Sequence, residues 1–182
     1  MKVLHAKDSG KDLNKITYVI LEWAEKKNFV VGFSGTRNLY QFFTEIVDFL
    51  PVSYSIHPEI EDAKVFDYFY KHYTNDFRDE FFEVMKSLYS DSKYSEYGII
   101  FTGHSLGAAM AFHAVGDFVL SGIDSQGPIK DMVKSSSKPY VQVYTFGQPR
   151  VGNYAFVKPI QDKVDELYRV VHNRDFVVHA PF

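Results

Sequence analysis

The sequence lacks several features that would narrow its function at once. It contains no cysteine, which excludes disulfides, thiolate metal ligands and thiol redox chemistry in any compartment. The longest basic run is Lys26-Lys27 and the formal net charge is -3, which argue against nucleic acid as a partner. No apolar run approaches the length that crosses a membrane, and residues 1–12 lack the apolar core of a signal peptide.

The length and the aromatic content describe what the chain does have. With 182 residues it fits one domain, residues 1–182, that buries a sizeable core without disulfides or metals. Its aromatic fraction of 17% is high, and aromatic core packing explains this better than a surface built for apolar ligands.

The most informative stretch runs from Ile99 to Ala109. An apolar segment leads into Gly103-His104-Ser105-Leu106-Gly107, which is the Gly-x-Ser-x-Gly pattern of a nucleophile elbow between a strand and a helix. Both glycines stand two positions from Ser105, where so sharp a turn leaves no room for side chains. The alternative interpretation is a serine that only caps the N-terminus of a buried helix.

The rest of the chain alternates between strand-like and helix-like patterns. This alternation predicts parallel strand pairing with right-handed crossovers in the later half. The charged stretch 25–28 separates the first two strands, which reads as a hairpin, and Pro51 ends the first helix. We expect strands at 16–21, 29–33, 97–102, 140–146 and 167–172, helices at 39–50, 62–89 and 108–120, and a surface loop at 121–138.

Five segments in this order match one enzyme family over nearly the whole chain. They are Val30–Thr36, Pro51–Tyr54, Thr102–Ala109, Thr145–Asn153 and Arg169–Asp175, of which Thr145–Asn153 is the most specific. On these segments the chain resembles the class 3 lipases, the filamentous-fungal triacylglycerol lipase family of α/β-hydrolases. The resemblance implies an α/β-hydrolase fold: a central, mostly parallel sheet flanked by helices, here incomplete at both ends. It implies neither a metal nor an organic cofactor.

The resemblance also assigns candidate site residues. Ser105 is the nucleophile, and Asp175 orients and supports a catalytic histidine. The backbone N–H groups of Thr36 and Leu106 form the oxyanion hole, in which each donor is typically worth about 3 to 4 kcal/mol. His104 braces the elbow by hydrogen bonding and is badly placed to act as the base. Taken alone, Asp175 reads as an ordinary turn residue and Thr36 as a turn or cap residue.

The base is the part of the pattern that this sequence does not supply. In the family the catalytic histidine follows one further strand after the aspartate, whereas His179 is the only histidine that follows Asp175 here. Four residues span at most about 14 Å, so contact between the two is sterically possible. Relatives hold a non-catalytic histidine at this place, and His179 is therefore a candidate base by position only. We expect the base to lie beyond this chain.

Two functions remain open from the sequence. The first is a serine esterase of the lipase type that acts on acylglycerols or phospholipids, in contact with a membrane or lipid-droplet surface. The second is a lipase-like, non-catalytic lipid-binding or signalling module, which the missing histidine favours. Residues 37–50 occupy the place of a lid in fungal relatives, although their helical apolar spacing equally fits a fixed packing helix.

Overall fold

A six-stranded sheet forms the centre of the computed structural model, which describes residues 1–9, 16–35, 50–121 and 138–181. The strand order across the sheet is β1-β2-β3-β6-β7-β8. The strands are β1 (Lys2–Ser9), β2 (Ile16–Trp23), β3 (Asn28–Phe33), β6 (Gly98–His104), β7 (Val141–Phe146) and β8 (Glu166–Val170).

The direction of the strands confirms the mostly parallel arrangement. Strands β1, β2 and β3 pair antiparallel, and β2 and β3 form the expected hairpin. Strands β3, β6, β7 and β8 pair parallel, so their carboxyl ends meet at one edge of the sheet. In open α/β sheets this edge is where ligands bind and reactions take place.

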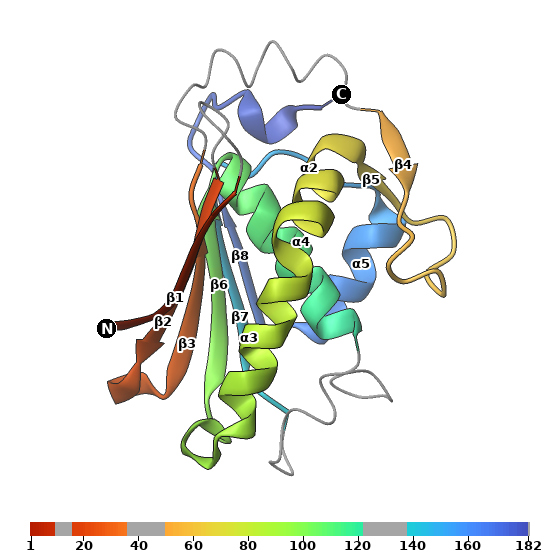
Figure 1. Cartoon of the computed structure of the whole chain (residues 1–182). Helices are drawn as coiled ribbons and strands as arrows, with labels where there is room; N and C mark the ends of the chain where they lie inside the picture. Colours follow the sequence, from red (N-terminus) through yellow and green to blue (C-terminus); the bar gives the residue numbers. More distant parts are fainter. Residues whose placement is uncertain (10–15, 36–49, 122–137, 182) are drawn as a thin grey trace.

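The described helices cover one face of the sheet (Figure 1). Residues alternate along β2, β3 and β7 between fully buried and half-buried, because the buried set faces the helices. The largest fully buried side chains are mostly tyrosine and phenylalanine, which confirms the core interpretation of the aromatic content. The helices are α2 (Asp67–His72), α3 (Arg78–Ser90), α4 (Leu106–Leu120) and α5 (Tyr154–Lys163).

The long helix expected at 62–89 is wrong at its beginning. Residues Lys64–Phe66 form β5, which pairs antiparallel with β4 (Pro51–Ser53), and the helix begins only at Asp67. Backbone bonds explain the difference, because Asn153 exchanges hydrogen bonds of 2.9 Å with both the N–H and the carbonyl of Lys64. From Asp67 onward α2, a π-helical turn at Tyr73–Phe77 and α3 follow one another without a break.

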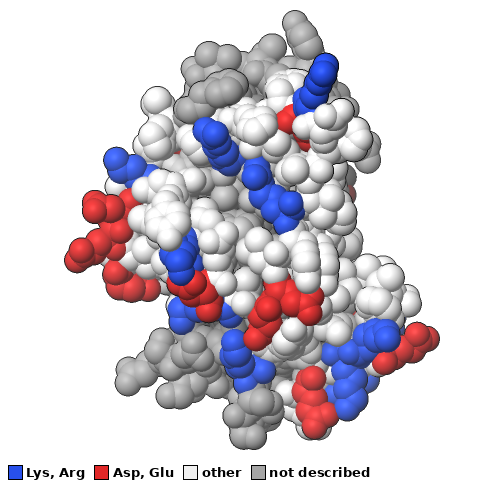
Figure 2. Space-filling view, turned by 180° about the vertical axis from the view of Figure 1, so that it is seen from behind, with Lys and Arg blue, Asp and Glu red and all other residues white. Residues whose placement is uncertain are grey.

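Two expected elements fall on residues that the structure does not describe. The helix at 39–50 lies outside the described residues except for Leu50, which is not helical, and most of the loop at 121–138 also lies outside them. No helix among the described residues combines the length and the apolar character that crossing a membrane requires. On the face seen in Figure 2, acidic and basic side chains are interspersed and leave uncharged surface between them.

Candidate active site

The turn between β6 and α4 has the geometry that the sequence predicts for an elbow. Ser105 sits between them with φ 54° and ψ -122°, a left-handed conformation that costs a residue with a side chain about 1 to 3 kcal/mol. Backbone bonds hold it there: its N–H donates to Phe146 O at 2.9 Å, and its carbonyl accepts from Ala108 and Ala109. The surrounding structure therefore fixes the strained turn.

The two glycines of the motif are required by close backbone contacts. A Cβ on Gly103 would lie 2.3 Å from the carbonyl oxygen of Gly107, which is too short for any side chain. A Cβ on Gly107 would lie 2.2 Å from the carbonyl oxygen of Phe33 at the end of β3. The start of α4 thus packs directly against the ends of β6 and β3, as the motif predicts.

The Ser105 hydroxyl is buried and unsatisfied. The residue is 3% exposed, and Oγ has no hydrogen-bond partner among the described residues. Leu106 begins α4, so its backbone N–H has no intrahelical acceptor, and the helix N-terminus carries positive partial charge. The Ser105 hydroxyl and a free backbone donor therefore lie on adjacent residues at the positive end of a helix, and such donors stabilise an oxyanion.

Asp175 lies near the carboxyl ends of the neighbouring strands. Its Oδ1 accepts a 2.9 Å hydrogen bond from Val177 N–H. Its Oδ2 lies 3.2 Å from the point that a Cβ on Gly147 would occupy, and that glycine has φ +55° just after β7. The Nε2 atom of His104 lies 3.5 Å from the same point. The carboxylate therefore lies beside the strand that neighbours the elbow strand, with Oδ2 free of any hydrogen bond among the described residues.

Within the described part of the chain, no histidine is joined to these residues. His179 ends a short 3-10 helix, Val177–His179, and is exposed, and neither a hydrogen bond nor an ion pair connects it to Asp175 or Ser105. The imidazole of His104 is also exposed and makes no hydrogen bond to a described residue, so the expected brace of the elbow is not found. The structure brings Ser105, Leu106 and Asp175 to one end of the sheet without a base.

Thr36 and the candidate lid, residues 37–50, lie outside the residues that the structure describes, apart from Leu50. The neighbouring Gly35 is described, and a Cβ there would lie 2.9 Å from the carbonyl oxygen of His104. The chain that leaves β3 therefore approaches the elbow closely just before Thr36. Its proposed donor role stays a prediction.

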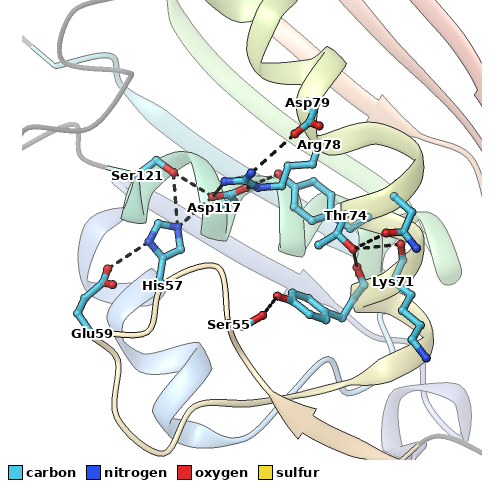
Figure 3. Close-up of polar contacts among 12 residues, drawn as sticks. Ser55, His57, Glu59, Lys71, Thr74, Arg78, Asp79, Asp117 and Ser121 are labelled. Atoms are coloured by element: carbon cyan, nitrogen blue, oxygen red, sulfur yellow. Dashed lines mark hydrogen bonds and ion pairs between the residues drawn. The ribbon is translucent and has the colours of Figure 1, made fainter.

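Sequence reasoning missed a buried polar cluster at the other end of α4 (Figure 3). Asp117 is fully buried and accepts hydrogen bonds from Arg78 Nε at 2.6 Å, from Tyr73 OH at 2.9 Å and from Ser121 Oγ at 2.9 Å. Nε2 of His57 donates to it at 2.9 Å. Burial alone raises the pKa of Asp117, but these donors and the Arg78 charge hold it below its usual value. The sequence signal that could have indicated this cluster was Asp117 itself, a single acidic residue in an otherwise apolar helix.

This cluster contains a serine, a histidine and a carboxylate in a row, but it is not a second catalytic triad. Ser121 Oγ lies 3.5 Å from His57 Nε2, and His57 Nδ1 lies 3.1 Å from Glu59 Oε1. However, His57 Nε2 is hydrogen-bonded to Asp117 at 2.9 Å, so it is not free to accept the serine proton. Ser121 Oγ itself donates a hydrogen bond to that same carboxylate. The histidine therefore ties the loop around residue 57 to α4 instead of activating a hydroxyl.

The histidine of α4, His113, also has an unusual environment. His113 is buried among the rings of Tyr70, Tyr73 and Phe156, and neither ring nitrogen has a partner among the described residues. Burial lowers its pKa to about 3, so the imidazole is neutral near pH 7. His113 therefore packs in the core as a neutral ring.

Comparison with known proteins connects these features to one family. The family model described as Lipase (class 3) matches residues 30–182. A lipase of Rhizopus niveus is 30% identical over 162 residues, which cover 89% of this chain and 37% of that protein. This chain thus spans well under half the length of that curated relative.

Solved structures agree with this match. The crystal structure of a lipase from Rhizopus microsporus var. chinensis is 30% identical, with a TM-score of 0.77 over all of this chain and 56% of its own. A triacylglycerol lipase described as having a serine protease triad as its catalytic centre is 27% identical, with a TM-score of 0.75 over 99% of this chain and 60% of its own. These neighbours confirm the α/β-hydrolase fold of the chain.

Proposed function

Because the chain belongs to the class 3 lipase family, we propose that it forms the core of an enzyme that hydrolyses carboxylic esters of lipids. The observation that carries the proposal is Ser105, a strained serine at the N-terminus of α4 whose Oγ has no hydrogen-bond partner among the described residues. Strain held by surrounding structure is typical of functional sites. Similar proteins named as a triacylglycerol lipase and as a phospholipase A1 of Arabidopsis thaliana support acylglycerols or phospholipids as the substrate class.

The chemistry follows that of acyl transfer to serine. Ser105 Oγ attacks the ester carbonyl carbon while its proton passes to a histidine base, and the carbonyl oxygen becomes an oxyanion. That oxyanion accepts hydrogen bonds from Leu106 N–H and from Thr36 N–H, the second proposed donor. The alcohol leaves with a proton, and water then hydrolyses the acyl-serine to the free acid and restores the hydroxyl.

The base is proposed to be a histidine beyond residues 1–182, oriented by Asp175. The free Oδ2 of this carboxylate supports the role, because an orienting aspartate needs an acceptor atom that points away from its own loop. Residues 1–182 alone should then turn over a short-chain p-nitrophenyl ester at most weakly. Turnover within about tenfold of a complete family member would instead return His179 to consideration as the base.

Exposed apolar side chains around the carboxyl edge of the sheet support a lipid surface as the partner. Phe146 and Val170 end their strands, Val171 follows, and Phe176 is next to Asp175, and all four are 44% to 59% exposed. A soluble protein seldom exposes several large apolar side chains together without an interaction to bury them. We propose that this edge faces the membrane or lipid droplet that holds the substrate.

The decisive experiment is covalent labelling of the full-length protein with a fluorophosphonate. The wild type should be labelled and Ser105→Ala should not, because the probe requires an activated serine. Ser121→Ala is the matched control, since it removes the hydroxyl beside His57 and should keep the labelling. Equal labelling of wild type and Ser105→Ala would contradict the proposal.

The second candidate is a lipase-like module that binds lipid without hydrolysing it. One observation favours it: no described histidine is bonded to Ser105 or Asp175. If full-length protein binds lipid vesicles but is neither labelled nor active on any ester, this second function replaces the first.

A further inference from the structure

A cavity of about 240 Å³ lies on the helical side of the sheet, and neither Ser105 nor Leu106 lines it. It is enclosed by α4, α5, β8 and the loop that follows β7. Its apolar wall consists of Phe112, Val157 and Leu167, one from each of the three elements. The volume is below that of pockets for drug-sized ligands, so it fits a head group and the first few carbons of a chain.

Two guanidinium groups line the same cavity without a carboxylate partner among the described residues. Nη2 of Arg169 donates to the carbonyl oxygens of Gln148 and Val178, both at 2.7 Å, which leaves its other N–H groups available. Arg150 is exposed and makes no ion pair within the described ranges. Burial, and then the charge of Arg150, lower the pKa of Arg169. The charge of Asp175 acts in the opposite direction and offsets part of this shift, but no described carboxylate forms an ion pair with Arg169 or Arg150.

A residue that lines this cavity also has a buried polar atom with no hydrogen-bond partner among the described residues. Gln148 lines it, is only 4% exposed, and its Oε1 accepts no hydrogen bond from any described residue. Buried side-chain oxygens in native proteins are nearly always satisfied, by protein, water or ligand. An amide in the lining can orient a polar head group or a water that accompanies it.

We propose that this cavity binds the anionic head group of a single-chain amphiphile, a carboxylate or a phosphate monoester. The anion lies between Arg150 and Arg169, and the first carbons of its chain lie against Phe112, Val157 and Leu167. Guanidinium groups suit both head groups, because they present N–H donors in a planar fork. The inference does not depend on catalysis at Ser105.

Titration of the protein with octanoate and with octyl phosphate, followed by calorimetry and by amide chemical shifts, tests the site. Saturable binding of either anion, with shifts centred on Arg150, Val157 and Leu167, is expected. The tighter of the two identifies the head group. Octanol, which has the chain without the charge, and inorganic phosphate, which has the charge without the chain, should each bind more weakly. Equal binding of octanol, or shifts confined to other surfaces, would overturn the proposal.

Three variants separate this site from general charge attraction and from the candidate active site. Arg150→Gln should weaken binding by roughly two- to fivefold, the effect of an ion pair on a partly exposed surface. Arg174→Gln removes an exposed arginine that does not line the cavity, and Ser105→Ala removes the proposed nucleophile. Both should bind as the wild type does. Unchanged affinity of Arg150→Gln, or an equal loss in either control, would refute the site, whatever the labelling of Ser105 shows.

Discussion

Acid destabilisation through His113 is the effect that the structure predicts most directly. In the native protein burial lowers its pKa to about 3, whereas in an unfolded chain the pKa of histidine is about 6.5. The unfolded state therefore binds the extra proton first, and the free energy of unfolding falls as the pH drops below 6.5. Between pH 7 and pH 5 the loss from this residue is about 2 kcal/mol. Any native pKa below 4 gives the same result, because proton uptake by the unfolded chain determines it.

Urea unfolding at pH 7 and at pH 5 measures this loss. His113→Leu replaces the ring with an apolar side chain of similar length, so its free energy of unfolding at pH 7 should stay within about 1.5 kcal/mol of the wild type. Its decline toward pH 5 should be smaller than that of the wild type by about 2 kcal/mol. His172→Gln, at an exposed position, is the control and should keep the full decline. If His113→Leu also keeps the full decline, the reasoning is refuted.

Three further predictions concern α4. Gly107→Ala places a Cβ 2.2 Å from a backbone oxygen at the end of β3 and should cost about 3 kcal/mol or more in urea unfolding, whereas Gly32→Ala, whose nearest atom is 3.5 Å away, should be near neutral. Asp117→Asn should lower the free energy of unfolding by about 3 to 5 kcal/mol, because it leaves Arg78 without its buried anion. The variant should also lack the part of the wild type's acid destabilisation below about pH 4 that comes from protonation of Asp117. Asp79→Asn, at an exposed carboxylate, should do neither. Ser105→Gly should be more stable than Ser105→Ala by about 0.5 to 2 kcal/mol, since only glycine relieves the left-handed strain, and equal stabilities would contradict the strain argument.

Local patterns in the sequence were enough to predict the elbow and the strands beside it. The turn depends on Gly103 and Gly107, which both lie within two residues of Ser105, so five consecutive residues are enough to recognise it, although the contact that requires Gly107 is with Phe33 of β3. The strand at β6 is a short apolar run that a Gly-x-Ser-x-Gly turn follows, and its ends were predicted to within two residues. Parallel pairing then followed from the alternation of strands and helices.

Elements with mixed local signals were not predicted. Strand β1 has lysines and a histidine among its apolar residues, and it forms because it pairs with the edge of β2. Helix α5 contains Pro159, which argues against a helix, yet it is capped by the side chain of Asn153 and buries Phe156 and Ile160. Tertiary contacts decide these two elements.

The buried cluster around Asp117 could not be predicted because its members are distant in sequence. Arg78 is 39 residues away and His57 is 60 residues away, and no spacing rule connects them. The same holds for the cavity at Arg150 and Arg169, which needs α4, α5 and β8 to be packed first. Polar groups brought together by the fold are visible only once the fold is known.

The energetics of the elbow favour the enzyme over the scaffold. The left-handed Ser105 costs about 1 to 3 kcal/mol, and a buried hydroxyl without a partner costs about 1 to 3 kcal/mol more. Together these are a sizeable share of the roughly 5 to 15 kcal/mol that stabilises a typical domain. A glycine at the same position would avoid both costs and keep the close packing of α4 against β6 and β3. The proposed role of Ser105 as a nucleophile accounts for these costs, because that role requires the hydroxyl that glycine lacks.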